Sequence, residues 1–287
     1  MPDPITTALA LSGAIGSAAK VANTPLFKTF IDGITGFKIS QWAAEGEVRK
    51  KLILDDYEKA KNSGIIGIQY ISALRELTNL INTAVKSSKY VIPDKPNDIK
   101  MDNDFFWNTI EHSKSISNEE MQELIAKIIA GEYNTPGTYS MSTLQIIKML
   151  GKNELELFER ICSLLINKVQ IPEKLFSLSD YDRDFIVELQ IGFSKFQALQ
   201  SLGLFLPSDM GRKIKNPKKE TFELTYFDKI FLFIHENENY LVIDIPRFYE
   251  LTMVGKQILK HLNPQYNDKY YAWLKANYKV PNYKILE

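Results

Sequence analysis

Very little in this sequence of 287 residues can form a disulfide or bind a metal ion. It has one cysteine, Cys162, and three histidines, His112, His235 and His261. A single cysteine excludes an internal disulfide, and the histidines are too widely spaced in the sequence for a ligand motif. Cys162 lies in an apolar run without a nearby cation, so we expect a buried, unreactive thiol rather than a nucleophile. The sequence predicts no metal and no cofactor.

An excess of charge of one sign is absent as well, because 35 Lys and Arg residues balance 35 Asp and Glu residues. The total charge therefore indicates neither an acidic nor a basic partner, and a binding surface has to come from local segregation of charge. Phosphate-binding loops, nucleophile elbows and dinucleotide fingerprints are missing. We find no catalytic constellation and expect a protein that is not an enzyme.

Four carboxylates nevertheless gather around one predicted helix: Glu119, Glu120, Glu123 and Glu132. Negative charge in the first turn of a helix complements the helix dipole, which explains the first three without catalysis. A catalytic role for the group is the alternative, and we favour the structural one.

The chain also lacks an apolar run long enough to cross a bilayer. Residues Pro4 to Ala19 carry no charge, but such a run is shorter than the ~20 residues that a transmembrane helix needs. No cationic segment precedes it, which argues against a secretory signal. Small residues dominate 4–24, which favours a weakly ordered tail or a helix packed in an oligomer. Reversible contact with a membrane surface is the alternative.

What the sequence does contain is helical periodicity. A charged helix is predicted from near Ser40 to Asn62, and apolar spacing from Ile68 to Ala84 predicts a second one. Two prolines in 92–98 then indicate a loop. We therefore place an N-terminal helical region at 1–91.

The segment from Ser117 to Glu132 is the best specified. Ser117 and Glu120 have the spacing of a capping box, and Gly131 is placed to end the helix. Apolar residues in between form one helix face: Met121, Leu124, Ile125, Ile128 and Ile129. Helices from Met141 to Leu150 and from Asn153 onward complete a central bundle at 92–171. Six residues should be buried in this core: Met121, Leu124, Ile128, Leu144, Phe158 and Leu165.

Residues 172–287 change in character. Helical spacing persists to Gly203, and β-type runs follow at Thr221–Phe227, Ile230–His235 and Tyr240–Ile245. The polar stretch 236–239 indicates a hairpin turn between the last two runs. Helices followed by a small sheet are typical of a winged-helix-like module. The fold class is therefore mainly α: a helical N-terminal region and central bundle with a C-terminal α+β winged-helix-like module.

Two basic features accompany this module. The first comprises five cations in eight residues: Arg212, Lys213, Lys215, Lys218 and Lys219. They either contact nucleic-acid phosphates or form a solvated loop. The second is the stretch from Lys256 to Lys284, which interleaves six lysines with aromatic residues. Its rings either stack on bases or, as we favour for Tyr270 and Trp273, dock the C-terminus onto the core.

The string from Ser117 to Glu132 resembles the signature of a bacterial family, domain of unknown function 2806. The resemblance extends to Phe105–Trp107, Pro136–Ser140, Thr143–Leu144 and Leu157–Phe158. Two positions depart from the family pattern: Ile125 stands where tryptophan is usual, and Ser142 where arginine is usual. More loosely, Leu199–Leu204 and Leu251–Lys256 resemble the abortive-infection alpha proteins. These resemblances imply a bacterial intracellular protein without assigned catalytic residues, and a part in defence against phage.

Two functions are consistent with these features. The first is a non-enzymatic defence-associated protein that acts through a protein partner or as a homo-oligomer. In that case its location is cytoplasmic, or peripheral to the inner membrane if residues 4–24 bind lipid. The second is a nucleic-acid-binding regulator that uses the winged-helix-like module and the cations from Arg212 to Lys219.

Overall fold

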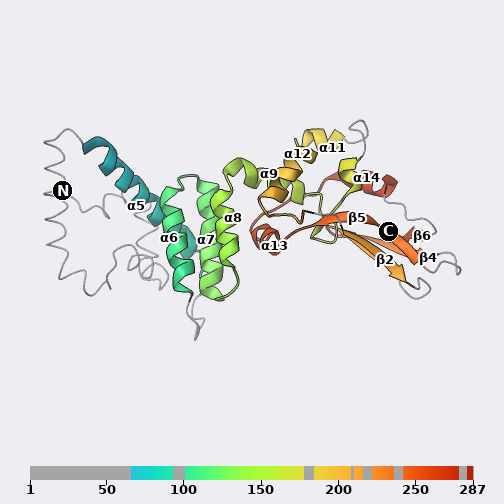
Figure 1. The fold of residues 1–287 in the computed structure, drawn as a ribbon, viewed down its shortest axis with the longest axis horizontal. Helices are drawn as coiled ribbons and strands as arrows, with labels where there is room; N and C mark the ends of the chain where they lie inside the picture. Colours follow the sequence, from blue (N-terminus) through green and yellow to red (C-terminus); the bar gives the residue numbers. More distant parts are fainter. Residues whose placement is uncertain are drawn as a thin grey trace. The chain divides into compact units, whose positions relative to one another are not determined.

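The computed structural model describes residues 66–92, 101–177, 184–207, 210–215, 222–235, 242–277 and 283–286. The helix expected between Ser40 and Asn62 and the small-residue segment 4–24 lie outside these residues. The described chain is mainly helical with a few short strands, as the sequence predicted (Figure 1). The chain divides into two compact units, Met1–Leu144 and Gln145–Glu287. This division differs from the expected boundaries at 91/92 and 171/172.

In the part of unit 1 that the structure describes, three helices pack together: α5 (Ile66–Ser88), α6 (Asn103–Ser115) and α7 (Glu119–Asn134). Helix α5 packs against both α6 and α7, and Figure 1 shows the three in blue to green. The apolar face of α7 is buried as predicted, with Ile128 fully buried and Leu124 only 3 % exposed. Sequence periodicity therefore found α5 and α7 correctly, whereas α6 was missed.

Buried polar side chains also join α5 to α7. The Asn79 amide donates to the carbonyl of Lys114 (2.8 Å), and the Gln122 amide donates to the carbonyl of Ile116 (2.8 Å). Lys86 Nζ donates to Gln122 Oε1 (3.1 Å), and burial lowers the pKa of Lys86. The Lys114 carbonyl belongs to the last turn of α6 and the Ile116 carbonyl to the connection between α6 and α7, so these bonds fix the end of α6 and that connection against α5 and α7.

The predicted capping box at the start of α7 is wrong. The N-cap is Asn118, whose side chain accepts a hydrogen bond from the Met121 N–H (3.0 Å). Glu120 is therefore not at the third helical position, and it is exposed. Ser117 accepts a hydrogen bond from the Asn79 amide instead (3.2 Å). An Asn side chain caps as well as Ser does, so two adjacent candidates cannot be separated by sequence.

The helix also continues past Gly131, to Asn134, so the prediction that Gly131 ends it is wrong. A Cβ atom at position 131 would lie 2.8 Å from Cε2 of Tyr139. The glycine is therefore required for the close approach of the Tyr139 ring rather than for a helix end.

A turn follows α7 at Thr135–Thr138. Its Gly137 has φ = 86°, and the Thr138 N–H donates to the Thr135 carbonyl (3.2 Å), as in a type II turn. The carboxylate of Glu132 is 2 % exposed and accepts from the N–H groups of Gly137 (2.6 Å) and Tyr139 (2.9 Å). Glu132 thus satisfies backbone donors in the turn. Helix α8 (Met141–Met149) then leads into unit 2.

Unit 2 contains two three-stranded antiparallel sheets (Figure 1). The first has the order β1-β5-β2 and the second the order β3-β4-β6. The strands are β1 (Gln170–Pro172), β2 (Met210–Lys215), β3 (Phe222–Tyr226), β4 (Lys229–His235), β5 (Val242–Glu250) and β6 (Tyr283–Leu286). The helices are α9 (Lys152–Cys162), α10 (Lys174–Ser177), α11 (Asp184–Glu188), α12 (Phe193–Ser201), α13 (Met253–Leu259) and α14 (Asp268–Asn277).

All three predicted β-type runs form strands, but the predicted hairpin between the last two is wrong. Strand β4 pairs with β3 and β6, whereas β5 pairs with β1 and β2 in the other sheet. The tight hairpin is β3–β4, where Phe227 takes a left-handed φ of 52° between Tyr226 and Lys229. Residues 236–239, proposed as the turn, lie outside the described residues.

Aromatic side chains form much of the core of unit 2. Phe196 lies 4.9 Å from Phe205, and Phe205 lies 5.8 Å from Phe158, measured between ring centroids. Tyr270 and Trp273 of α14 are buried, which confirms that the aromatic C-terminal region docks onto the core. Cys162 is also buried, as expected, and burial raises the pKa of its thiol. The six predicted core residues are each buried, four in unit 1 and two in unit 2.

Candidate nucleic-acid interface

Helices α11 and α12 are joined by a four-residue turn, 189–192. The Ile191 N–H donates to the Ile186 carbonyl (3.0 Å), and Gln190 takes a φ of 53°. The apolar Ile191 is 6 % exposed, so the turn is fixed on its inner side. Two helices with such a short connection have the connectivity of a helix-turn-helix, the motif whose second helix enters the major groove in DNA-binding proteins.

One face of α12 packs into the core. Phe196 and Leu199 are fully buried, three residues apart. The Phe196 ring stacks on Phe176 of α10 at a centroid distance of 4.5 Å and contacts Tyr249 of β5 at 4.9 Å. These contacts fix the rotation of α12 about its axis and so decide which residues remain exposed.

The opposite face of α12 is polar and contains no acidic residue. Its exposed side chains are Ser194, Lys195, Gln197, Ala198 and Ser201, with Phe193 at the start of the helix. In the major groove, a lysine can donate hydrogen bonds to guanine, a glutamine can hydrogen-bond to adenine, and an alanine can make an apolar contact with the thymine methyl group. Lys195 Nζ donates to the Gln190 carbonyl (2.6 Å), which places the ammonium group beside the turn. Sequence reasoning missed these residues.

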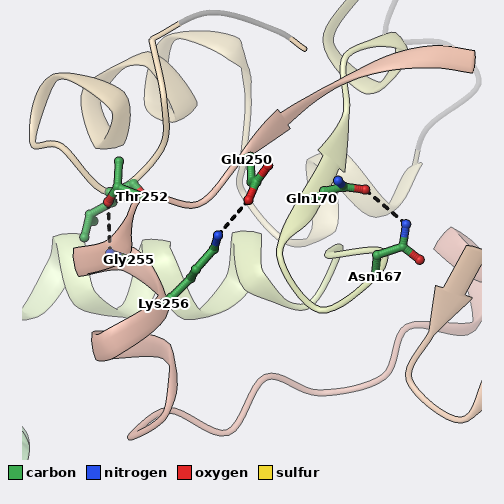
Figure 2. Close-up of polar contacts among 7 residues, drawn as sticks. Asn167, Gln170, Glu250, Thr252, Gly255 and Lys256 are labelled. Carbon is green, nitrogen blue, oxygen red and sulfur yellow. Dashed lines mark hydrogen bonds and ion pairs between the residues drawn. The ribbon is translucent and has the colours of Figure 1, made fainter. Parts of the chain in front are cut away.

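The C-terminal end of α12 is fixed by the segment that starts α13. Figure 2 shows Thr252, which caps α13 by accepting from the Gly255 N–H (3.0 Å). The same hydroxyl donates to the Gly203 carbonyl (2.6 Å), and the Thr252 N–H donates to the Leu204 carbonyl (3.0 Å). The same view shows the ion pair between Lys256 Nζ and Glu250 Oε1, which lie 2.6 Å apart. The end of α12 is thereby linked to strand β5 and helix α13.

Three of the five predicted nucleic-acid contacts belong to strand β2 rather than to a loop. Arg212, Lys213 and Lys215 pair in register with Ile245, Asp244 and Val242 of β5. The pairing with β5 explains the error, because a partner strand remote in sequence converts a polar segment into a strand. The other two, Lys218 and Lys219, lie outside the described residues.

Charge is segregated along unit 2 although the whole chain is neutral. From Leu189 to Lys219 the sequence has six basic residues and one acidic residue, Asp209. The preceding stretch from Glu173 to Glu188 has five acidic and two basic residues. Five of these six basic residues lie between Arg212 and Lys219, and α12 contributes the sixth, Lys195.

A family model described as "Protein of unknown function (DUF2806)" matches residues 71–275. The chain belongs to the DUF2806 family. No curated protein and no solved structure matches it. The match confirms the family inferred from Ser117–Glu132, while the looser resemblance to abortive-infection alpha proteins stays a prediction.

The matched range of this DUF2806 protein contains both the signature helix α7 and the helices α11 and α12. In the residues described, no helix is long and apolar enough to span a membrane. Nor do the described His, Cys, Asp and Glu residues form a group of three or more that could hold a metal ion.

Proposed function

We propose that unit 2 of this DUF2806 protein is a winged-helix module that binds double-stranded DNA. Support comes from the order of its elements: α9, β1, α10 with α11, α12, β2 and β5. This is a helix, a strand, three short helices of which the last two are joined by a turn, and two strands that pair with each other. The antiparallel order β1-β5-β2 places the first strand beside the last, as in a winged helix. The β3–β4 hairpin lies in the connection between β2 and β5, the wing position.

The observation that carries the proposal is the exposed face of α12. It combines Lys195 and Gln197 with small side chains, lacks acidic residues, and lies within the segment of six basic residues and one acidic residue. Among the exposed side chains of α12, Phe193 is the one large apolar group that could anchor a protein partner in a pocket. Side chains that are short, neutral or basic instead allow a helix to approach the bases between two phosphate backbones.

The proposed mechanism divides the work between two elements. Helix α12 enters the major groove, where Lys195 and Gln197 contact base edges. Strand β2 and the residues after it supply cations to the phosphates, which release counterions when they are neutralised. Base contacts then provide sequence preference, and phosphate contacts provide most of the affinity.

Replacing Lys195 and Gln197 together by Ala should weaken binding to the preferred DNA far more than binding to unrelated DNA. Each good base contact contributes about 1–3 kcal/mol of discrimination, so losing two costs about 2–6 kcal/mol, and we expect specificity to fall by roughly one and a half to four orders of magnitude. The preferred duplex is first selected from a randomised library with the wild-type protein. Fluorescence anisotropy then compares it with an unrelated duplex for each variant.

Two further variants separate base contacts from phosphate contacts. Replacing Lys213, Lys215, Lys218 and Lys219 by Ala should weaken binding to all sequences alike and reduce the salt slope by about 0.9 for each phosphate that is no longer neutralised. Lys260→Ala removes an exposed cation outside the basic segment and should change neither the affinity for DNA nor its salt slope. If the wild type binds no duplex at low salt, the proposal is wrong.

We retain phage defence as a broader proposal, supported by the resemblance of Leu199–Leu204 and Leu251–Lys256 to the abortive-infection alpha proteins. Such a role, through a protein partner or through membrane contact of residues 4–24, is compatible with DNA binding by unit 2. A strain that lacks the gene should then lose protection in a phage plaque assay. Equal plaque counts with and without the gene, across a broad phage panel, would exclude it.

A further inference from the structure

Phe193 places an aromatic ring at the start of α12, outside the core. It is 45 % exposed, whereas Phe196, three residues later, is fully buried. The residue before it, Gly192, has extended backbone, and no heavy atom lies within 4 Å of the position that a Cβ there would take. The first residue of the proposed recognition helix is therefore large, apolar and accessible.

One side of the Phe193 ring rests on the aromatic residues beneath it. Its centroid lies 5.8 Å from that of Phe176 in α10, at an interplanar angle of 43°. Phe176 in turn stacks on the buried ring of Phe196, with centroids 4.5 Å apart. Because this contact already restricts the Phe193 side chain, covering its exposed side costs little further side-chain entropy.

Phe193 and Gln197 lie on the same side of α12. They are four residues apart, and side chains at that spacing are neighbours on a helix surface, with about 5–6 Å between their Cβ atoms. Gln197 is exposed and is one of the two residues assigned above to base edges. Since the N-terminal residues of a recognition helix are the ones that contact bases, Phe193 reaches base edges when Gln197 does.

The chemistry of a phenyl ring decides which base edge suits Phe193. The ring has no hydrogen-bond donor or acceptor, so it leaves the polar edges of guanine, cytosine and adenine without partners where it covers them. Of the four bases, thymine alone presents an apolar group in the major groove, its C5 methyl. A phenylalanine at this position therefore matches thymine and disfavours the other three bases.

We propose that Phe193 selects a thymine in the DNA site through contact with the methyl group of that base. The inference rests on the proposed DNA binding by unit 2 and adds a base preference to it. Gln197 reads an adenine one helical turn away, and successive base pairs are about 3.4 Å apart along the duplex. The preferred site therefore contains two A·T pairs, one read by each residue, within about two steps of each other.

The test replaces thymine by uracil, which lacks the methyl group and keeps every hydrogen-bonding group. The preferred duplex is selected from a randomised library with the full-length wild type, and each of its thymines is replaced in turn. We expect one position at which uracil raises the Kd roughly fourfold, the change that loss of one buried methyl group produces. The other thymines should tolerate uracil. Competition measured by fluorescence anisotropy gives each Kd.

Phe193→Ala should bind the thymine and uracil duplexes equally, whereas Val187→Ala should keep the wild-type preference. Val187 is 67 % exposed on α11, so this control also truncates an exposed apolar side chain but leaves α12 intact. Phe193→Gln retains a long side chain beside Phe176 and should give the same result as Phe193→Ala if the alanine variant fails to fold. A preference for thymine over uracil that persists in these Phe193 variants would overturn the inference.

The wild-type measurements separate this inference from DNA binding itself. Sequence-dependent binding without sensitivity to uracil at any position would overturn the role of Phe193 and leave DNA binding by unit 2 in place. Its exposed ring would then be open to a protein partner. The absence of binding to any duplex at low salt would overturn both.

Discussion

Replacing Ile128 by Asp should unfold unit 1. Ile128 is fully buried in the middle of α7, between the buried residues Leu124 and Ile125 on one side and Glu132 on the other. The aspartate would be either charged without a partner or protonated and unsatisfied, and both cost several kcal/mol in an apolar interior. Domains have only about 5–15 kcal/mol of stability, so this single change removes most or all of it. Amide hydrogen exchange of α5, α6 and α7 measures the loss.

Two controls distinguish the buried charge from other effects of the substitution. Ile128→Val keeps the apolar character and should cost only about 0.5–1.5 kcal/mol. Ser142→Asp adds the same charge at an exposed position of α8 in unit 1 and should leave exchange in α5–α7 unchanged. If the amides of α5, α6 and α7 exchange as slowly in the Ile128→Asp variant as in the wild type, the assignment of α7 as a core helix is wrong.

The core of α7 could be predicted because its signal is local. Met121, Leu124 and Ile128 repeat at helical spacing, and a helix with one apolar face has to bury that face. The errors at the ends of the same helix have a different origin. Asn118 and Ser117 are equally good caps, and the role of Gly131 depends on the Tyr139 ring eight residues later. Only the three-dimensional structure brings that ring to the glycine.

The pairing of strands in unit 2 depends even more on remote residues. Periodicity located β3, β4 and β5, but it could not show that β5 pairs with β1, about seventy residues earlier in the chain. The β2 segment contains a single β-branched residue, Ile214, among basic residues, so propensity gave no sign of a strand. Pairing of strands distant in sequence is decided by the whole fold, which single-residue preferences do not encode.

The candidate interface was predicted in part, for the same reasons. The cations from Arg212 to Lys219 stand out in the sequence because charge is visible without structure. Lys195 and Gln197 do not, because an exposed Lys and Gln on a helix are common. They become candidates only when Phe196 and Leu199 are seen to be buried, which leaves them on the opposite face. In the sequence, the turn between α11 and α12 could have been suspected from Gln190 and Gly192, which lie between the two helical segments.

Replacing Gly255 by Ala should destabilise unit 2, although alanine is the better helix former. A Cβ atom on Gly255 would lie 2.3 Å from the Leu204 carbonyl oxygen and 3.0 Å from Cδ2 of Leu251. The first of these is a backbone atom, and it accepts the Thr252 N–H, so it cannot move without breaking that bond. Overpacking of this kind costs about 1–3 kcal/mol or more, which exceeds the gain of about 1 kcal/mol in helix propensity. We expect faster amide exchange in α12 and α13.

Gly192→Ala is the matched control, because it makes the same chemical change in the same unit. Gly192 precedes α12, has extended backbone, and has no heavy atom within 4 Å of the position that a Cβ would take. Its effect should stay within about 1 kcal/mol, the cost of placing alanine at an N-cap. Because Leu204 follows α12, Gly255→Ala should also displace α12 and lower DNA specificity. Unchanged stability in Gly255→Ala would show that α13 does not approach the end of α12 as closely as the structure has it.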